Sequence, residues 1–264
     1  RIFFVDPAQA IALADSALAT NRRYRYIKGT GRAYHALGQA LARKGRDAEA
    51  MDAYQNAFVL FEKVGDKRGW ATTHAGMGQL YERQRLIPQA LDNYQKAYHL
   101  ASETRFMRET ARNLARVAAI YNQYHHRSDT ALLLLKRAMR ENKDPYDTSL
   151  DSFIQHNIGY AYLSRKEYAI AKQYFEKALQ IAASKGLPEP MAAAYKALAV
   201  TALRTGNYAE GRRQAQMALE NSRIAKNIDD MRGTAFLLSN LHERLGNHKE
   251  ALRYQRLGEQ AKDS

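Results

Sequence analysis

Small and apolar residues recur along the chain at spacings of three and four residues. In one stretch, Ala171, Phe175 and Ala178 form such a stripe, and Ile158 and Gly159 precede it. Side chains that are three or four residues apart lie on one face of an α-helix. No run shows the strict alternation of apolar and polar residues that is typical of a half-buried strand. The pattern therefore predicts amphipathic helices.

The same arrangement returns about every 40 residues. Each copy begins with an apolar residue followed by a small one and ends with a stripe of small and larger residues. The copies are Leu37-Gly38 with Ala50, Tyr54 and Ala57; Met77-Gly78 with Ala90, Tyr94 and Ala97; Val117-Ala118 with Ala131, Leu135 and Ala138; Ile158-Gly159 with Ala171, Phe175 and Ala178; Leu198-Ala199 with Gly211, Ala215 and Ala218; and Leu238-Ser239 with Ala251, Gln255 and Gly258. Self-similarity at a fixed period is the sequence signature of repeat proteins.

Polar turns that often carry Gly separate the stripes. Gly45, Gly206 and Gly246 each follow a predicted first helix, at a position where a left-handed residue commonly ends the helix. Each unit is therefore predicted to be an antiparallel helix pair that buries its apolar face against neighbouring units. We expect a single domain over 1–264, with a half repeat at 6–21 and six repeats at about 29–64, 68–104, 107–142, 148–185, 188–225 and 229–261.

These residues resemble the tetratricopeptide-repeat family over about residues 6–261. Two features depart from the family pattern: the early Trp is replaced, for example by Tyr34 and His74, and the Pro that ends the second helix is missing. The period is also longer than the usual 34 residues or so. The resemblance implies an all-α fold, a right-handed α-solenoid of stacked antiparallel helix pairs. Long repeats of this kind are similar to the sensor regions of bacterial histidine kinases and LuxR-type regulators, and to Rap-like peptide receptors.

Composition and charge narrow the classes of function. The chain has 41 Lys and Arg against 27 Asp and Glu, a formal net charge of +14, and no Cys. The lack of Cys excludes disulfides, thiolate catalysis and Cys-ligated zinc. No apolar run approaches the roughly 18 residues of a membrane-spanning helix. The first residue is Arg1 rather than Met, so we expect a piece of a longer protein.

Catalytic and metal-binding motifs are weak. His242-Glu243 is followed by His248, which lies too far along the chain for the one-turn spacing of a zinc-protease helix. No Gly-rich phosphate loop is present, and no Ser stands in a nucleophile motif. We therefore expect no catalytic residue, no metal and no cofactor in this segment, and no enzyme activity, although a parent protein could carry a kinase domain.

The resemblance implies that the first helix of each unit lines a concave face. Amide side chains can bond a peptide backbone both as donor and as acceptor, and Arg pairs with carboxylates. The lining therefore fits a protein or peptide ligand, including an acidic one. The predicted ligand-binding residues are Arg32, His35, Gln39, Arg43, Gln79, Arg83, Arg112, Arg116, Asn122, Gln123, His156, Asn157, Tyr160, Lys196, Arg204 and Asn240.

Three functions remain open from the sequence. The first is a protein- or peptide-binding module in a larger bacterial signalling protein, a histidine kinase or a transcriptional regulator, in the periplasm or the cytoplasm. The second is a freestanding Rap-like peptide receptor or assembly scaffold. The third is a basic surface for nucleic acid or another anionic partner, because cations cluster near the start of the chain, at Arg22, Arg23, Arg25, Lys28 and Arg32. No nucleic-acid motif accompanies these cations, so nucleic acid is not the expected partner.

Overall fold

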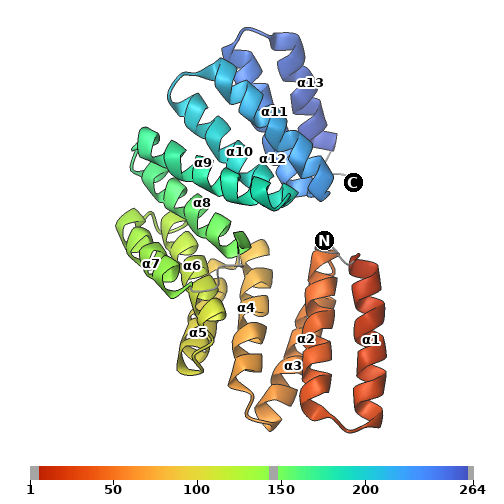
Figure 1. The fold of residues 1–264 in the computed structure, drawn as a ribbon. Coiled ribbons are helices and arrows are strands. Elements are labelled where there is room, and N and C mark those ends of the chain that lie inside the picture. Colours follow the sequence, from red (N-terminus) through yellow and green to blue (C-terminus); the bar gives the residue numbers. More distant parts are fainter. Residues whose placement is uncertain (1–5, 143–147, 261–264) are drawn as a thin grey trace. The chain divides into compact units, whose positions relative to one another are not determined.

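A computed structural model describes residues 6–142 and 148–260. Within these ranges the chain forms helices and no strand (Figure 1). The helices are α1 (Pro7–Arg23), α2 (Ile27–Arg43), α3 (Asp47–Lys63), α4 (Lys67–Arg83), α5 (Ile87–Glu103), α6 (Met107–Gln123), α7 (Ser128–Glu141), α8 (Thr148–Ser164), α9 (Tyr168–Ser184), α10 (Pro188–Arg204), α11 (Tyr208–Ala225), α12 (Ile228–Arg244) and α13 (His248–Gln260). The predicted all-α fold is confirmed.

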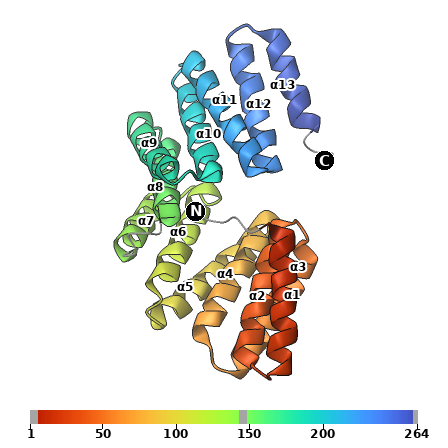
Figure 2. The ribbon, with the colours of Figure 1, turned by 45° about the vertical axis from the view of Figure 1, so that its right-hand side comes forward.

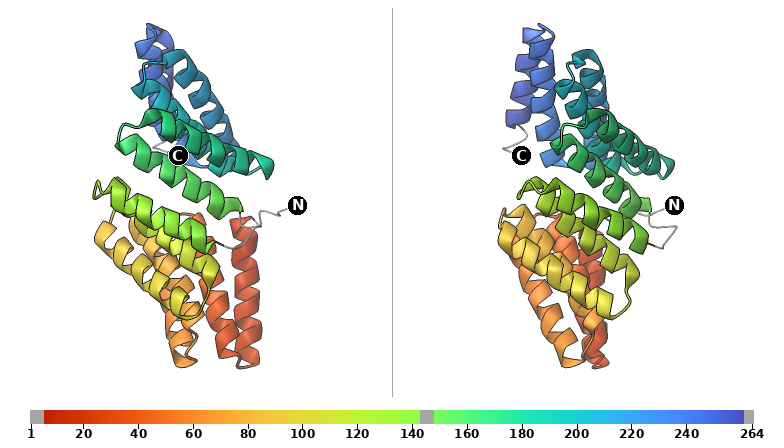
Figure 3. Two further views of the ribbon diagram at one scale, coloured as in Figure 1. Left: turned by 60° about the vertical axis from the view of Figure 1, so that its left-hand side comes forward. Right: turned by 90° about the vertical axis from the view of Figure 1, so that its left-hand side faces the viewer.

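Consecutive helices pack as pairs, and the pairs form two compact units divided between Ile120 and Tyr121. In the N-terminal unit α2 packs on α3 and α4 packs on α5. In the C-terminal unit the pairs are α8 with α9, α10 with α11, and α12 with α13, as the views from other sides also show (Figures 2 and 3). The first helices of successive pairs also touch: α2 contacts α4, α8 contacts α10, and α10 contacts α12. Their outward side chains therefore share one face within each unit.

The predicted stripes of the second helices form the core. In α9, Ala171, Phe175 and Ala178 are all 0 % exposed. The corresponding residues of α3, α5 and α7 are also buried. The stripe weakens in α13, where Gln255 is exposed. The spacing of small and large residues thus correctly identified the buried side of most second helices.

Glycine in the first helix makes room for the ring of the second helix. A Cβ added at Gly38 would lie 2.8 Å from Tyr54, and one added at Gly78 would lie 2.9 Å from Tyr94. Such distances are far inside van der Waals contact. In these copies glycine therefore admits an aromatic side chain as well as a close helix.

Turns between helices share a residue in the left-handed region. Among the described residues, it is Gly at five turns, including Gly45, Gly206 and Gly246, and a basic residue at six others, including Lys226 (φ 54°). The left-handed conformation costs a non-Gly residue roughly 1–2 kcal/mol. A basic residue at this position lies next to the C-terminal end of the preceding helix, where positive charge is favoured.

Lys226→Gly is expected to raise the free energy of unfolding by about 0.5–1 kcal/mol, because Gly adopts the left-handed conformation without strain. Urea unfolding followed by circular dichroism measures the change. The matched control is Lys185→Gly, since Lys185 has a φ of −114°. There Gly only adds freedom to the unfolded chain, so stability should fall or stay constant. Equal effects at both positions would contradict the strain argument.

Candidate functional site

The first helices of the C-terminal unit bring four predicted residues close to one another. His156 and Tyr160 lie one turn apart on α8, and Lys196 occupies on α10 the position that His156 occupies on α8. All three side chains are partly buried, and Asn157 lies beside them on α8. Because α8 contacts α10 directly, these residues form one continuous patch.

Aromatic side chains pack against one another beneath the surface of this patch. The His156 ring lies 4.8 Å from the Tyr160 ring, edge to face, and 5.7 Å from the ring of Phe175 on α9. Tyr160 also meets Phe175 edge to face at 5.2 Å. Edge-to-face contacts of this kind are favourable because the ring edge is positive and the face negative. Both side chains are therefore held in position before any ligand arrives.

The protonation states of the cluster follow from its surroundings. Burial lowers the pKa of His156 to about 4, and the charge of Lys196 acts in the same direction. Burial and the charge of Asp230 raise the pKa of Tyr160 to about 12. Near neutral pH, Tyr160 therefore keeps its hydroxyl proton and His156 is uncharged.

Asp230 of α12 completes the patch. Its carboxylate accepts a hydrogen bond from the Lys196 ammonium and another from the Asn227 amide at 3.0 Å. Asn227 also caps α12, since its Oδ1 accepts a hydrogen bond from the backbone N–H of Asp230 at 3.0 Å. Asp230 lies 34 residues after Lys196 and is not among the residues predicted from the sequence.

The remaining predicted residues of this unit lie around the patch or away from it. The Asn157 amide donates to the Phe153 carbonyl at 2.8 Å, which leaves its oxygen as an acceptor. Asn240 is exposed on α12, and Arg204 is exposed at the end of α10. At the end of α6, Gln123 is exposed, whereas Asn122 is buried and accepts from Ser128 at 3.0 Å.

The N-terminal unit places its predicted residues differently. Gln39 and Gln79 are exposed at equivalent positions of the touching helices α2 and α4. Arg32 and Arg43 are also exposed on α2. His35 instead packs on Tyr54, with 5.5 Å between the ring centroids, and its Nδ1 is buried without a hydrogen-bond partner. Burial lowers the pKa of His35 to about 4, so its side chain belongs mainly to the core.

Several predicted cations already pair with carboxylates of the chain. Arg83 lies 2.6 Å from Asp47, and Arg116 lies 3.7 Å from Glu82. Arg112 pairs at 2.8 Å with a carboxylate in its own helix, that of Glu109. These contacts neutralise part of the positive charge that the sequence assigned to this face.

Most ion pairs between repeats join residues 34–38 positions apart. Examples are Lys28 with Asp66 at 3.0 Å and Arg165 with Asp129 at 2.7 Å. This separation is one repeat less about one helical turn. Opposite charges at that spacing are the signal that could have identified Asp230 as the partner of Lys196.

A second polar cluster lies at the turn between α1 and α2. Tyr24 is 72 % exposed and Tyr26 is 51 % exposed. Arg23 lies over the Tyr24 ring at 6.0 Å, and Arg22 donates to the Tyr34 hydroxyl. The turn thus combines cations with accessible rings, a combination suited to anionic groups.

Over 6–142 and 148–260, no three His, Asp or Glu side chains gather as metal ligands would. In the same ranges, none of the helices has the length and apolar character needed to cross a bilayer.

Paired helices with buried stripes, together with a polar face on the first helices, define a helical-repeat interaction module. Tetratricopeptide-repeat sequence profiles match residues 29–103 and 154–185. The chain therefore contains tetratricopeptide repeats over these two ranges. No curated protein sequence matches it significantly.

Solved structures with the same fold include a Rap protein, a quorum sensor and a pilus biogenesis factor. A Rap protein complexed with competence and sporulation factor aligns with a TM-score of 0.69 and 14 % identity, covering 90 % of this chain and 75 % of that one. The apo quorum sensor NprR from B. thuringiensis aligns with a TM-score of 0.65 and 13 % identity, covering 96 % and 83 %. PilW, a type IV pilus biogenesis factor, aligns with a TM-score of 0.61 and 16 % identity, covering 85 % and 90 %. At these low sequence identities, the similarity shows a shared fold alone.

Proposed function

We propose that this chain is a peptide-binding module whose ligand lies on the first helices of the C-terminal unit, across α8, α10 and α12. The observation that carries this proposal is the patch of His156, Tyr160, Lys196 and Asp230, which is partly buried and held in place by neighbouring side chains. Preorganised polar groups of this kind bind at a lower entropic cost than free surface side chains.

The chemistry of the patch suits a peptide backbone. The Lys196 ammonium has three N–H donors, and the hydrogen bond to Asp230 uses one of them. The other two are left for a ligand. Tyr160 offers a hydroxyl and the exposed part of an aromatic ring, and Asn240 offers an amide. These groups donate hydrogen bonds, which the carbonyl oxygens or a carboxylate of a bound peptide would accept. Asp230 partly neutralises the charge of Lys196. Binding to the patch therefore depends more on the extended backbone of the peptide than on its negative charge.

The similar folds support this assignment. The Rap protein of similar fold binds competence and sporulation factor in its complex, and NprR is a quorum sensor. We further infer that the chain is the sensor or interaction region of a larger bacterial signalling protein, a histidine kinase or a transcriptional regulator. A freestanding receptor or scaffold of the Rap kind is the alternative, and the complete reading frame distinguishes the two. In either case the segment acts by binding rather than by catalysis.

Selection from a displayed library of random peptides tests the proposal. Enriched peptides should bind the native protein and lose affinity by about tenfold or more, at least 1.4 kcal/mol, in the variant Tyr160→Phe with Lys196→Gln. These substitutions remove the hydroxyl and the charge while preserving most of the packing. The matched control is Tyr24→Phe with Lys136→Gln, which removes the same groups at exposed positions. No enrichment, or an equal loss in both variants, would refute the proposal.

A further inference from the structure

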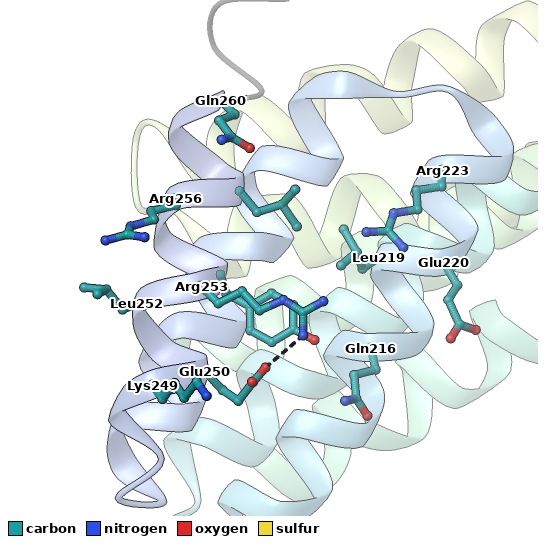
Figure 4. Close-up of a pocket in the computed structure, with 12 residues that line it drawn as sticks. Gln216, Leu219, Glu220, Arg223, Lys249, Glu250, Leu252, Arg253, Arg256 and Gln260 are labelled. Atoms are coloured by element: carbon teal, nitrogen blue, oxygen red, sulfur yellow. Dashed lines mark hydrogen bonds and ion pairs between the residues drawn. The ribbon is translucent and has the colours of Figure 1, made fainter.

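We propose a second docking surface in the trough between the second helices α11 and α13, for an acidic amphipathic helix of a protein partner. The trough encloses about 820 Å³. It lies on the second helices, whereas the patch around Tyr160 lies on the first helices. Figure 4 shows that side chains of α11 and α13 line its two walls.

Apolar side chains form the floor of this trough. Leu219 of α11 is 5 % exposed, and Tyr254 and Leu257 of α13 are partly buried. All three belong to the apolar cluster that joins α11, α12 and α13. The accessible parts of Tyr254 and Leu257 leave apolar surface that a partner side chain would cover.

The wall on α13 carries a stripe of exposed cations. Lys249, Arg253 and Arg256 are four and three residues apart, so they follow one side of the helix over about 10 Å. Arg223 of α11 stands on the opposite wall (Figure 4). A ligand must therefore present negative charge along its length rather than at one point.

The charge of the trough is unbalanced. Four cations line it against two carboxylates, those of Glu220 and Glu250. Glu250 lies 3.3 Å from Arg253 in an exposed pair, and exposed pairs of this kind contribute little stability. Within the described part of the chain, no ion pair joins Lys249, Arg256 or Arg223 to a carboxylate.

The cation stripe is not a requirement of the repeat. At the equivalent positions of α9 stand Ala169, Gln173 and Glu176, so the fold tolerates neutral and acidic residues there. A smaller pocket of about 250 Å³ in the same unit is lined by α9, α10 and the start of α11, and it carries both Lys172 and Glu176. The stripe of three cations is thus a property of α13 in particular.

An acidic amphipathic helix fits this combination of surfaces. Carboxylates at spacings of four and three on such a helix match the spacing of the three α13 cations, and its apolar side would cover Tyr254 and Leu257. Nucleic acid fits less well, because the floor is apolar and because Glu220 and Glu250 would face a phosphate backbone. Charge complementarity and apolar burial therefore both favour a protein segment.

Fluorescence anisotropy with a designed probe tests this surface. The probe is a labelled helical peptide with Glu at alternating four- and three-residue spacings and Leu on the adjacent face. The whole chain is expected to bind it with a Kd below about 100 µM at low salt. The triple variant Lys249→Gln, Arg253→Gln, Arg256→Gln should weaken binding by about tenfold or more. The matched control, Lys136→Gln, Arg140→Gln, Lys185→Gln, removes equal charge elsewhere in the unit and should change Kd less than about twofold.

Three further measurements separate the alternatives. A probe with Gln in place of Glu should bind at least about tenfold more weakly, and an oligothymidine should bind no more tightly than this neutral probe. The Lys196→Gln variant should bind the acidic probe as the native protein does. If both triple variants lose affinity equally, or if the oligothymidine binds more tightly than the acidic probe, the trough is not the proposed site. If Lys196→Gln alone abolishes binding, the probe occupies the first-helix patch, and only the trough proposal fails.

Discussion

Replacing Gly159 with alanine is expected to lower the free energy of unfolding by about 1–3 kcal/mol, because the added methyl overpacks the core. The new Cβ would lie 2.5 Å from Cε1 of Phe175. Phe175 is itself 0 % exposed and is held by His156 and Tyr160, so the ring has little space in which to move. Urea unfolding followed by circular dichroism measures the loss.

The chain contains its own control for this effect. In another repeat, Ala118 stands at the position of Gly159, and the second helix carries Leu135 instead of an aromatic residue. In a further repeat, Ala199 stands at this position and the residue opposite is the small Ala215. Phe175→Leu should therefore rescue part of the loss caused by Gly159→Ala. The double-mutant cycle is expected to show a coupling energy of about 1 kcal/mol or more. Strict additivity of the two substitutions would contradict the contact between Gly159 and the ring.

Acidification from pH 7.5 to 5 is expected to destabilise the protein by about 2 kcal/mol for each of the two histidines His35 and His156. Both have folded pKa values near 4, below the ordinary value of 6.5, mainly because burial disfavours the charged imidazole. For His156, Lys196 acts in the same direction and Asp230 opposes it. The unfolded chain binds protons below pH 6.5 and the folded chain does not. This stability is therefore complete above pH 6.5 and is lost as the pH falls towards 4.

Urea unfolding at pH 7.5, 6.5 and 5 measures this dependence. The double variant His35→Leu, His156→Leu should reduce the difference in unfolding free energy between pH 7.5 and 5 by about 4 kcal/mol. His242, whose pKa burial also lowers, contributes to the dependence that remains. Exposed His125 and His248 provide the control, and their substitution by Gln should leave the difference unchanged. An unaltered slope in the buried double variant would show that other groups govern acid unfolding.

Repeat spacing predicted the fold well because it is a local property. The period of about 40 residues and the stripes of Ala, aromatic and Ala identified paired helices, and the same stripes are buried in α3, α5, α7 and α9. The repeat boundaries and the handedness of the solenoid stay predictions. The predicted end of the last repeat, residue 261, lies outside the described residues.

The candidate site was harder to predict, because exposure and charge pairing depend on neighbouring repeats. The sequence grouped Arg83, Arg116 and Lys196 as cations available to a ligand. In the folded chain each lies beside a carboxylate from another repeat, in Asp47, Glu82 and Asp230. His35 also looked like a lining residue, yet its ring packs on Tyr54.

The amino-acid order alone specified the helices, their buried stripes and the glycines at helix ends, because each depends on residues within one or two turns. The packed structure decided which polar side chains pair, which rings face glycine, and where cations gather in the trough between α11 and α13. A ring that faces glycine, such as Tyr54 against Gly38, comes from the paired helix of the same repeat. The ion pairs instead join neighbouring repeats, as Lys196 joins Asp230, and form only when successive repeats stack.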